Sequence, residues 1–193
     1  MRARDNPFRS DRVLSVRYRL ECGTWEELLE RFDALGRRAA IVGPQGSGKS
    51  TLLEDLAPHF RDRGGSVCPL RLDAGLPRFE KEFLHDFLAS LTPRSVIFFD
   101  GAEQLGRMAW SRFERRSRMA GGLLVTLHRP GRLPTLLETR TSPELFDSLV
   151  RQILGDRAGE VRSLMPRLYE KHGGNLRDAL RELYDHYAAA NDG

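Results

Sequence analysis

One stretch, GPQGSGKST at residues 43–51, constrains the fold more than any other part of the chain. A short apolar run at 39–42 precedes it and residues with helical spacing follow it, so a buried strand, a glycine-rich turn and a helix are expected in succession. Its spacing, Gly-x-x-x-x-Gly-Lys-Ser, is the phosphate-loop pattern. Glycines let the backbone approach a ligand closely, and the N–H groups at the helix start point at phosphate oxygens. The sequence therefore predicts a turn that binds phosphate groups.

Two side chains of this turn have distinct tasks. Lys49 can reach the outer phosphates of a nucleotide, and the Ser50 hydroxyl can bind Mg²⁺. Of the 31 basic residues only three are lysines, so the lysine at this position stands out in an arginine-rich chain. Its compact charge suits a turn wrapped around phosphates better than the planar fork of arginine does. We expect the whole turn to contact the nucleotide: Gly43, Pro44, Gln45, Gly46, Ser47, Gly48, Lys49, Ser50 and Thr51.

Strand and helix patterns alternate along the first three quarters of the chain. The residue spacing predicts helices at 25–35, 49–60, 80–91 and 104–118, and strands at 39–42, 66–73, 95–100, 122–128 and 135–141. Several strands are continuously apolar, which is typical of strands covered on both faces in a parallel sheet. Pro69 suggests that the strand at 66–73 lies at an edge. The pattern predicts an α/β domain with a mostly parallel sheet of about five strands.

After residue 141 only helical patterns remain. Ser142 and Pro143 form a good helix start, since serine caps and proline suits the first helical position. Further helical patterns cover 161–172, where Pro166 forces a kink or a late start, and 175–190. We therefore expect a basic N-terminal arm at 1–20, an α/β domain at 21–141 and a small helical, lid-like bundle at 142–193.

The composition fits a soluble globular chain with a net charge of +4. Six arginines lie in residues 1–19 and five in residues 107–118, so nucleic acid, acidic partners or plain solvated surface remain open. No apolar run reaches the roughly 18 residues of a membrane span, and the N-terminus does not resemble a secretory signal. Cys22 and Cys68 are expected to be reduced thiols. A cytoplasmic protein without membrane contact is expected.

The phosphate loop and the strand–helix order around it resemble the ASCE division of P-loop NTPases over residues 37–141. The resemblance implies a three-layer sandwich and a bound Mg²⁺-nucleotide. The guanine-specifying NKxD motif of GTPases and the LSGGQ signature of ABC transporter ATPases are both absent. ATP and Mg²⁺ are therefore the expected ligands.

The segment FFDGAEQL, residues 98–105, provides the acidic half of the expected site. Asp100 ends an apolar strand, where the resemblance implies the Walker B aspartate that holds Mg²⁺ together with Ser50. Gly101 occupies the place where many AAA+ enzymes have their base, and the D-G-x-acid form is similar to STAND and NACHT ATPases. Glu103 would then orient or deprotonate the attacking water, with Asp100 on the same helical edge. The alternative is a glutamate favoured only by a helix start.

Resemblance to AAA+ proteins also suggests residues that sense the nucleotide. Thr126 and His128, at the end of the strand at 122–128, are the candidates for the first sensor. Arg129 and Arg132 follow, and an arginine there can act as a finger on a neighbouring subunit. The tail sequence HGGNLRDAL is similar to the sensor 2 segment of AAA+ lids, which implies that Arg177 contacts the γ-phosphate.

These features favour a Mg²⁺-dependent ATPase that works as a nucleotide-driven conformational switch, with a protein partner or self-association. One alternative is a small-molecule kinase, with Asp73 holding the acceptor and residues 112–118 forming an arginine-bearing lid. Another is a non-hydrolysing nucleotide sensor or DNA-associated helper that uses the basic arm. Its DNA affinity would fall steeply with salt.

Overall fold

The computed structural model describes residues 6–9, 12–13, 16–20 and 23–189. The chain forms two compact units. The sheet unit consists of Arg19–Gly43 and Lys49–Glu138, and the helical unit of Met1–Tyr18, Pro44–Gly48 and Thr139–Gly193. Cys22 and much of the predicted basic arm lie outside the described residues.

The described residues of the sheet unit form a five-stranded, all-parallel sheet, which confirms the predicted α/β fold class. Its spatial order is β2-β3-β4-β1-β5, so β2 is an edge strand, as Pro69 predicted. The carboxyl ends of β3, β4 and β1 therefore lie next to one another along one edge of the sheet. The strands are β1 (Arg38–Val42), β2 (Ser66–Arg71), β3 (Ser95–Asp100), β4 (Gly122–Leu127) and β5 (Thr135–Glu138).

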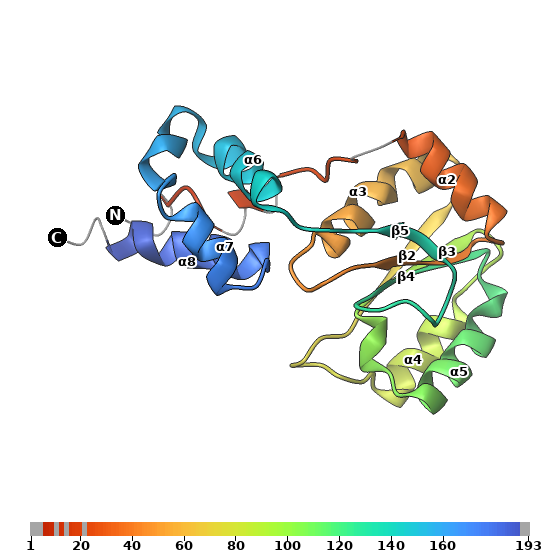
Figure 1. The fold of residues 1–193 in the computed structure, drawn as a ribbon. Coiled ribbons are helices and arrows are strands. Elements are labelled where there is room, and N and C mark those ends of the chain that lie inside the picture. The colour runs from red at the N-terminus through yellow and green to blue at the C-terminus, as the bar shows by residue number, and fades with distance from the viewer. Residues whose placement is uncertain (1–5, 10–11, 14–15, 21–22, 190–193) are drawn as a thin grey trace. The chain divides into compact units, whose positions relative to one another are not determined.

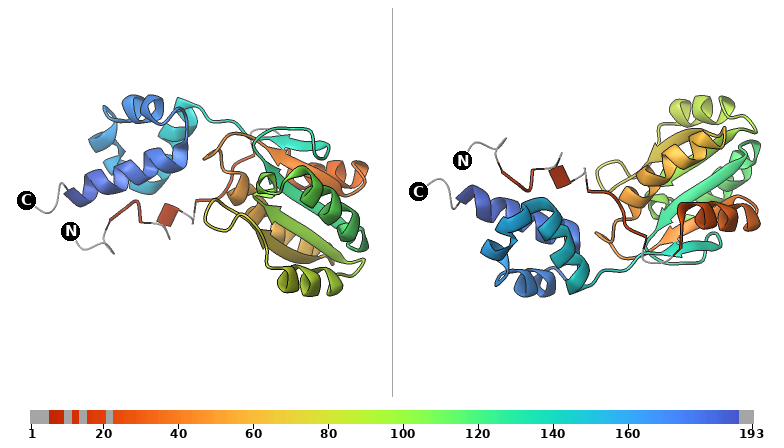
Figure 2. Two further views of the ribbon diagram at one scale, coloured as in Figure 1. Left: turned by 90° about the horizontal axis from the view of Figure 1, so that it is seen from below. Right: turned by 90° about the horizontal axis from the view of Figure 1, so that it is seen from above.

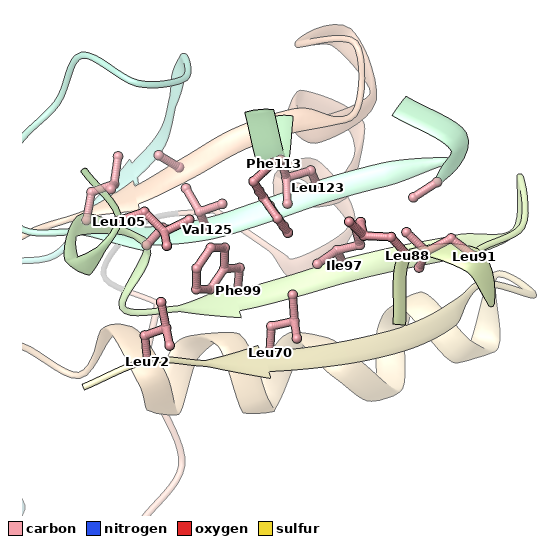
Figure 3. Close-up of a cluster of buried hydrophobic side chains, with 14 of the residues drawn as sticks. Leu70, Leu72, Leu88, Leu91, Ile97, Phe99, Leu105, Phe113, Leu123 and Val125 are labelled. Carbon is pink, nitrogen blue, oxygen red and sulfur yellow. The ribbon is translucent and has the colours of Figure 1, made fainter. Parts of the chain in front are cut away.

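Helices cover both faces of this sheet (Figures 1 and 2). On one face lie α2 (Trp25–Ala34) and α3 (Lys49–Asp62), and on the other α4 (Lys81–Ala89) and α5 (Arg107–Arg116). Successive side chains of a strand point to opposite faces, so β3 contacts the helices on both faces of the sheet. Phe98 packs edge-on against Phe60 of α3, with ring centroids 5.3 Å apart, and Phe99 packs against Phe113 of α5 at 5.1 Å. Figure 3 shows the cluster around Phe99.

The local signals of the N-terminal part are confirmed. The Thr24 hydroxyl accepts a hydrogen bond from the Glu27 backbone N–H, and the Glu27 carboxylate accepts one from the Thr24 N–H. This reciprocal capping box satisfies two backbone donors at the start of α2. The helix after the phosphate loop begins at Lys49 as predicted and runs two residues further, to Asp62.

The predicted helix at 104–118 is wrong in its boundaries. The segment is divided into a short 3₁₀ turn, η2 (Ala102–Gln104), the helix α5 and a second 3₁₀ turn, η3 (Ser117–Met119). Gly101 has a left-handed backbone, and Gly106 is extended and caps α5, so the chain turns twice before the helix begins. Helical periodicity alone could not separate these turns from the helix.

The helical unit contains α6 (Pro143–Leu154), η4 (Gly155–Val161), α7 (Met165–Lys171) and α8 (Leu176–Ala189). Ser142 caps α6 by accepting a hydrogen bond from the Leu145 N–H, and Pro166 lies in the first turn of α7, so that helix starts late. Phe8, from the N-terminal segment, is buried in the core of this unit. In the part of the chain that the structure describes, no helix is both long enough and apolar enough to cross a membrane.

Candidate functional site

Asp100 lies at the carboxyl end of β3, and strand alternation decides which way it points. Its side chain leaves the sheet on the same side as that of Phe98, which packs against α3. The first turn of α3 carries Ser50, whose hydroxyl donates a hydrogen bond of 2.8 Å to Asp100 Oδ2. The structure thus brings together the two residues that the sequence predicted as metal ligands, fifty positions apart.

Thr126 holds the same carboxylate from the neighbouring strand. Its hydroxyl donates to Asp100 Oδ1 at 2.7 Å and accepts from the Gly101 backbone N–H at 2.8 Å. The side chain is only 1% exposed. Because β4 lies directly beside β3, the hydroxyl can reach both groups, so Thr126 orients the carboxylate and fixes the turn that follows it.

Gly101 begins a turn that only glycine fits well. Its φ is +80°, and a Cβ there would overlap the backbone carbonyl oxygen of Leu72. The chain then forms η2, which carries Glu103. Asp100 and Glu103 are therefore not one turn apart on a continuous helix, since the left-handed Gly101 and the start of a 3₁₀ turn lie between them, and their facing the same edge stays a prediction.

Glu103 pairs with His128, which follows β4. Glu103 Oε1 lies 3.2 Å from His128 Nε2, with the two side chains 24% and 44% exposed. The other carboxylate oxygen, Oε2, is buried and has no hydrogen-bond partner among the described residues. A buried carboxylate oxygen without a donor is costly, so it marks an acceptor position that a water or ligand donor can satisfy. The chemistry suits a base that accepts a proton from water.

Arg132 is already bound within its own chain. Its guanidinium donates to the carbonyls of Ala102 and Leu105, which bracket Glu103 in sequence. Burial lowers the pKa of Arg132, and the nearby Glu103 carboxylate partly opposes that shift. Sequence reasoning had considered this arginine only as a finger toward another subunit. The cis contacts had no sequence signal, because they join segments about thirty residues apart.

The lysine of the phosphate loop is ordered by the loop itself. Lys49 is 8% exposed, and its Nζ donates a hydrogen bond of 2.8 Å to the Gly43 carbonyl. The hydrogen bond joins the ammonium group to the residue that follows β1, within the sheet unit. Lys49 and Ser50 are consecutive, so the Lys49 side chain and the Ser50–Asp100 pair start from the same end of α3.

The central loop residues belong to the helical unit. Ser47 Oγ lies 2.6 Å from Thr139 Oγ1, and it also donates to the Pro44 carbonyl. Gly46 has φ +75°, and a Cβ there would overlap the Asn175 amide oxygen. Thr139 and Asn175 are neighbours of the loop that sequence reasoning missed: Thr139 belongs to no motif, and in the segment HGGNLRDAL the attention fell on Arg177.

The nucleotide contacts predicted for Arg177, Gln45, Gly48 and Thr51 remain predictions. Arg177 is exposed in the first turn of α8. Asn175 precedes that helix and pairs with Asp178 through both its amide nitrogen and its oxygen. The described contacts do not assign roles to Gln45, Gly48 or Thr51.

The residues present fit a magnesium nucleotide better than a metal held by protein alone. Among the described residues no group of three histidine, cysteine or carboxylate side chains could cage a metal ion. Mg²⁺ usually takes one or two protein oxygens and completes its shell with phosphates and water. Ser50 and Asp100 supply such a pair of oxygens beside the phosphate loop.

Comparisons with known proteins agree with this geometry. No protein-family model matches the chain, and no protein with a curated description matches it. Among solved structures, a RuvB mutant of Thermotoga maritima matches with a TM-score of 0.50 and 14% identity, over 82% of this chain and 60% of that one. Domain III of the Thermotoga maritima replication initiation protein DnaA matches with a TM-score of 0.53 and 16% identity, over 81% and 78%.

The chain thus spans less than two thirds of the RuvB structure. At these identities the likeness concerns the fold alone. It agrees with the all-parallel sheet and the loop between β1 and α3, which are the features of a P-loop NTPase fold.

Proposed function

We propose that the protein binds ATP with Mg²⁺ and hydrolyses it. The observation that carries this proposal is the arrangement of Ser50, Asp100 and Thr126 at the carboxyl edge of the sheet. The crevice outside the carboxyl ends of parallel strands is where open α/β sheets bind their ligands. The fold shared with AAA+ ATPases supports the same ligand class.

Each residue has a defined task in this proposal. Lys49 binds the outer phosphates. Ser50 and Asp100 would hold Mg²⁺, which would neutralise part of the phosphate charge. Glu103 accepts the proton of the attacking water, using a carboxylate that already has one buried oxygen without a donor. His128 holds the other oxygen and so keeps the side chain from rotating away.

A conformational switch is the second part of the proposal. Arg177 and the helices after residue 142 are proposed to respond to the γ-phosphate, because lids that contact this group can be released by hydrolysis. The support is the position of Arg177 in the first turn of α8 and the contacts of Ser47 with Thr139. The Ser47–Thr139 hydrogen bond thus joins the loop to the segment before α6, where a bound ligand could change it.

The kinase alternative finds less support in the described contacts. Asp73 caps its own loop, since its Oδ1 accepts hydrogen bonds from the Gly75 and Leu76 N–H groups. Residues 112–118 belong to α5 and η3, and Phe113 is buried against the sheet, so they do not form a free lid. The chain direction carries them from the carboxyl end of β3 back toward the start of β4, away from the phosphate loop.

The helper alternative stays open as a prediction about partners. One structural neighbour is named as a replication initiation protein, which is a property of that protein. For this chain, a fluorescent oligonucleotide titrated at several salt concentrations tests the idea. Binding that weakens steeply with salt supports a nucleic-acid partner, and no binding at low salt removes it.

The deciding experiment compares the native chain with Lys49→Ala and Glu103→Gln. We measure ATP affinity by titration and phosphate release with and without Mg²⁺. Lys49→Ala should weaken ATP binding about tenfold or more, since a charge-assisted hydrogen bond contributes about 1.5–3 kcal/mol. Glu103→Gln should bind ATP normally and turn over about 10²–10⁴ times more slowly.

Matched controls exist for both variants. Lys81→Ala removes a lysine at the exposed start of α4, and Glu82→Gln neutralises an exposed glutamate beside it. Neither should change binding or turnover. Tight ATP binding without any turnover in the native chain would remove the hydrolase proposal, and normal turnover in Glu103→Gln would remove Glu103 as the base.

A further inference from the structure

We propose that Arg132 is a positioning residue, which fixes the 3₁₀ turn carrying Glu103 and thereby aims the carboxylate at the attacking water. This inference rests on the proposed ATP hydrolysis. It assigns a cis role to an arginine whose position in the sequence had suggested only contact with another subunit.

The geometry of the guanidinium carries the proposal. Its two terminal nitrogens donate to two carbonyls, that of Ala102 at 2.7 Å and that of Leu105 at 2.5 Å. A third, longer contact of 3.5 Å reaches the Glu103 carbonyl. The planar fork therefore spans the backbone on both sides of Glu103. The Ala102 carbonyl already accepts the Leu105 N–H within the turn, so the guanidinium adds a second, charge-assisted donor to it.

The arginine is itself held in place. Its Cζ lies 5.1 Å from the centre of the Trp110 ring, a cation–π contact within the sheet unit. It is also partly buried, which makes its hydrogen bonds stronger than they would be in water. An arginine held in this way can transmit the rigidity of α5 to the turn that precedes it.

Two different devices thus hold the candidate base. His128 contacts the carboxylate, and Arg132 contacts the backbone that carries it. Arg132 makes no described hydrogen bond to the Glu103 carboxylate, so it acts through Glu103 and not on the reacting atoms. Lysine, a point charge without the planar fork, could reach only one of the two carbonyls well.

The first test reads the turn without using activity. We compare amide hydrogen exchange of Gln104 and Leu105, whose N–H groups close the turn on Gly101 and Ala102, in native protein and Arg132→Lys. Exchange should rise at least about tenfold, because charge-assisted hydrogen bonds are lost. Arg129→Lys changes an exposed arginine of the same loop and should leave these amides unaffected.

The second test asks whether Arg132 acts through Glu103. Single-turnover hydrolysis should slow about tenfold or more in Arg132→Lys and Arg132→Gln, with ATP affinity within about twofold of native. In the Glu103→Gln background the same Arg132 changes should cause no further loss. Far-UV circular dichroism and thermal unfolding confirm that each variant is folded.

The outcomes separate this inference from the proposed function. Unchanged exchange at Gln104 and Leu105 in Arg132→Lys overturns the positioning role, whatever the activity. A different result overturns the action through Glu103. In that case the amides exchange faster in Arg132→Lys, but the Arg132 change slows hydrolysis by the same factor in the Glu103→Gln background as in the native chain. If the native chain binds ATP but does not turn it over, the proposed function fails, and the exchange data alone decide whether Arg132 holds the turn.

Discussion

Replacing Thr126 by valine tests the geometry of the site through stability alone. Valine has nearly the shape of threonine, so it leaves no cavity, but it lacks the hydroxyl that joins Asp100 and the Gly101 N–H. The change therefore removes one donor from a carboxylate and leaves one backbone N–H unsatisfied, at a position that is 1% exposed.

The expected loss follows from these two contacts. A hydrogen bond to a charged group contributes about 1.5–3 kcal/mol, and a buried unsatisfied donor costs about 1–3 kcal/mol. The two effects share one hydroxyl and do not simply add, so we expect a loss of about 3 kcal/mol for Thr126→Val. The control, Thr126→Ser, keeps the hydroxyl and removes a methyl group, which should cost about 1 kcal/mol.

The chain offers an intrinsic probe for this measurement. Both of its tryptophans, Trp25 on α2 and Trp110 on α5, belong to the sheet unit. Tryptophan fluorescence during urea unfolding therefore reports that unit separately. With an m-value of about 2 kcal/mol per molar urea, the midpoint should fall by about 1.5 M in Thr126→Val and by about 0.5 M in Thr126→Ser.

If Thr126→Val is as stable as Thr126→Ser, or more stable, the hydroxyl does not satisfy the buried groups as described. A changed m-value in the valine variant would mean that unfolding exposes a different amount of surface in that variant. The two variants are then compared by their free energies of unfolding, each calculated with its own m-value.

Three further changes probe other parts of the chain. Gly101→Ala should destabilise the sheet unit by more than about 3 kcal/mol, because alanine is strained in the left-handed conformation and its Cβ would overlap backbone atoms. The control Gly106→Ala, at φ −63°, should cost under about 1 kcal/mol, and tryptophan fluorescence measures both variants. Ser142→Ala should cost the helical unit about 1 kcal/mol by tyrosine fluorescence, against no change for the exposed Ser163→Ala. Burial and a hydrogen bond to a carboxylate raise the pKa of Tyr187 to about 12, so its contribution to stability is complete below about pH 10 and is lost as the pH rises toward 12. A tyrosinate absorbance titration should show this late ionisation, and Tyr187→Phe should abolish it.

Local signals in the sequence predicted much of the fold. The capping box at Thr24, the start of α6 at Ser142 and the edge position of Pro69 each depend on a few neighbouring residues. The apolar run ending at Asp100 likewise predicted β3 with the correct bounds. These features follow from backbone hydrogen bonding and side-chain alternation, which act over one or two turns of chain.

The details of the site depended on contacts that no local pattern encodes. Helical spacing extended across Gly101 and hid the turn that carries Glu103. In an arginine-rich sequence nothing distinguishes Arg132 from the other arginines, because its two carbonyl partners are distant in sequence. The link between Asp100 and Thr126 required the strand order, which the sequence did not specify.

The division of the phosphate loop has a consequence for how such a chain can change over evolution. Pro44–Gly48 group with the helical unit, while Gly43 and Lys49 group with the sheet unit. The C-terminal segment is therefore not interchangeable on its own, because replacing residues 139–193 would remove Thr139, the hydrogen-bond partner of Ser47 in the loop. We expect the loop and this segment to be inherited together, with substitutions at Thr139 compensated at Ser47.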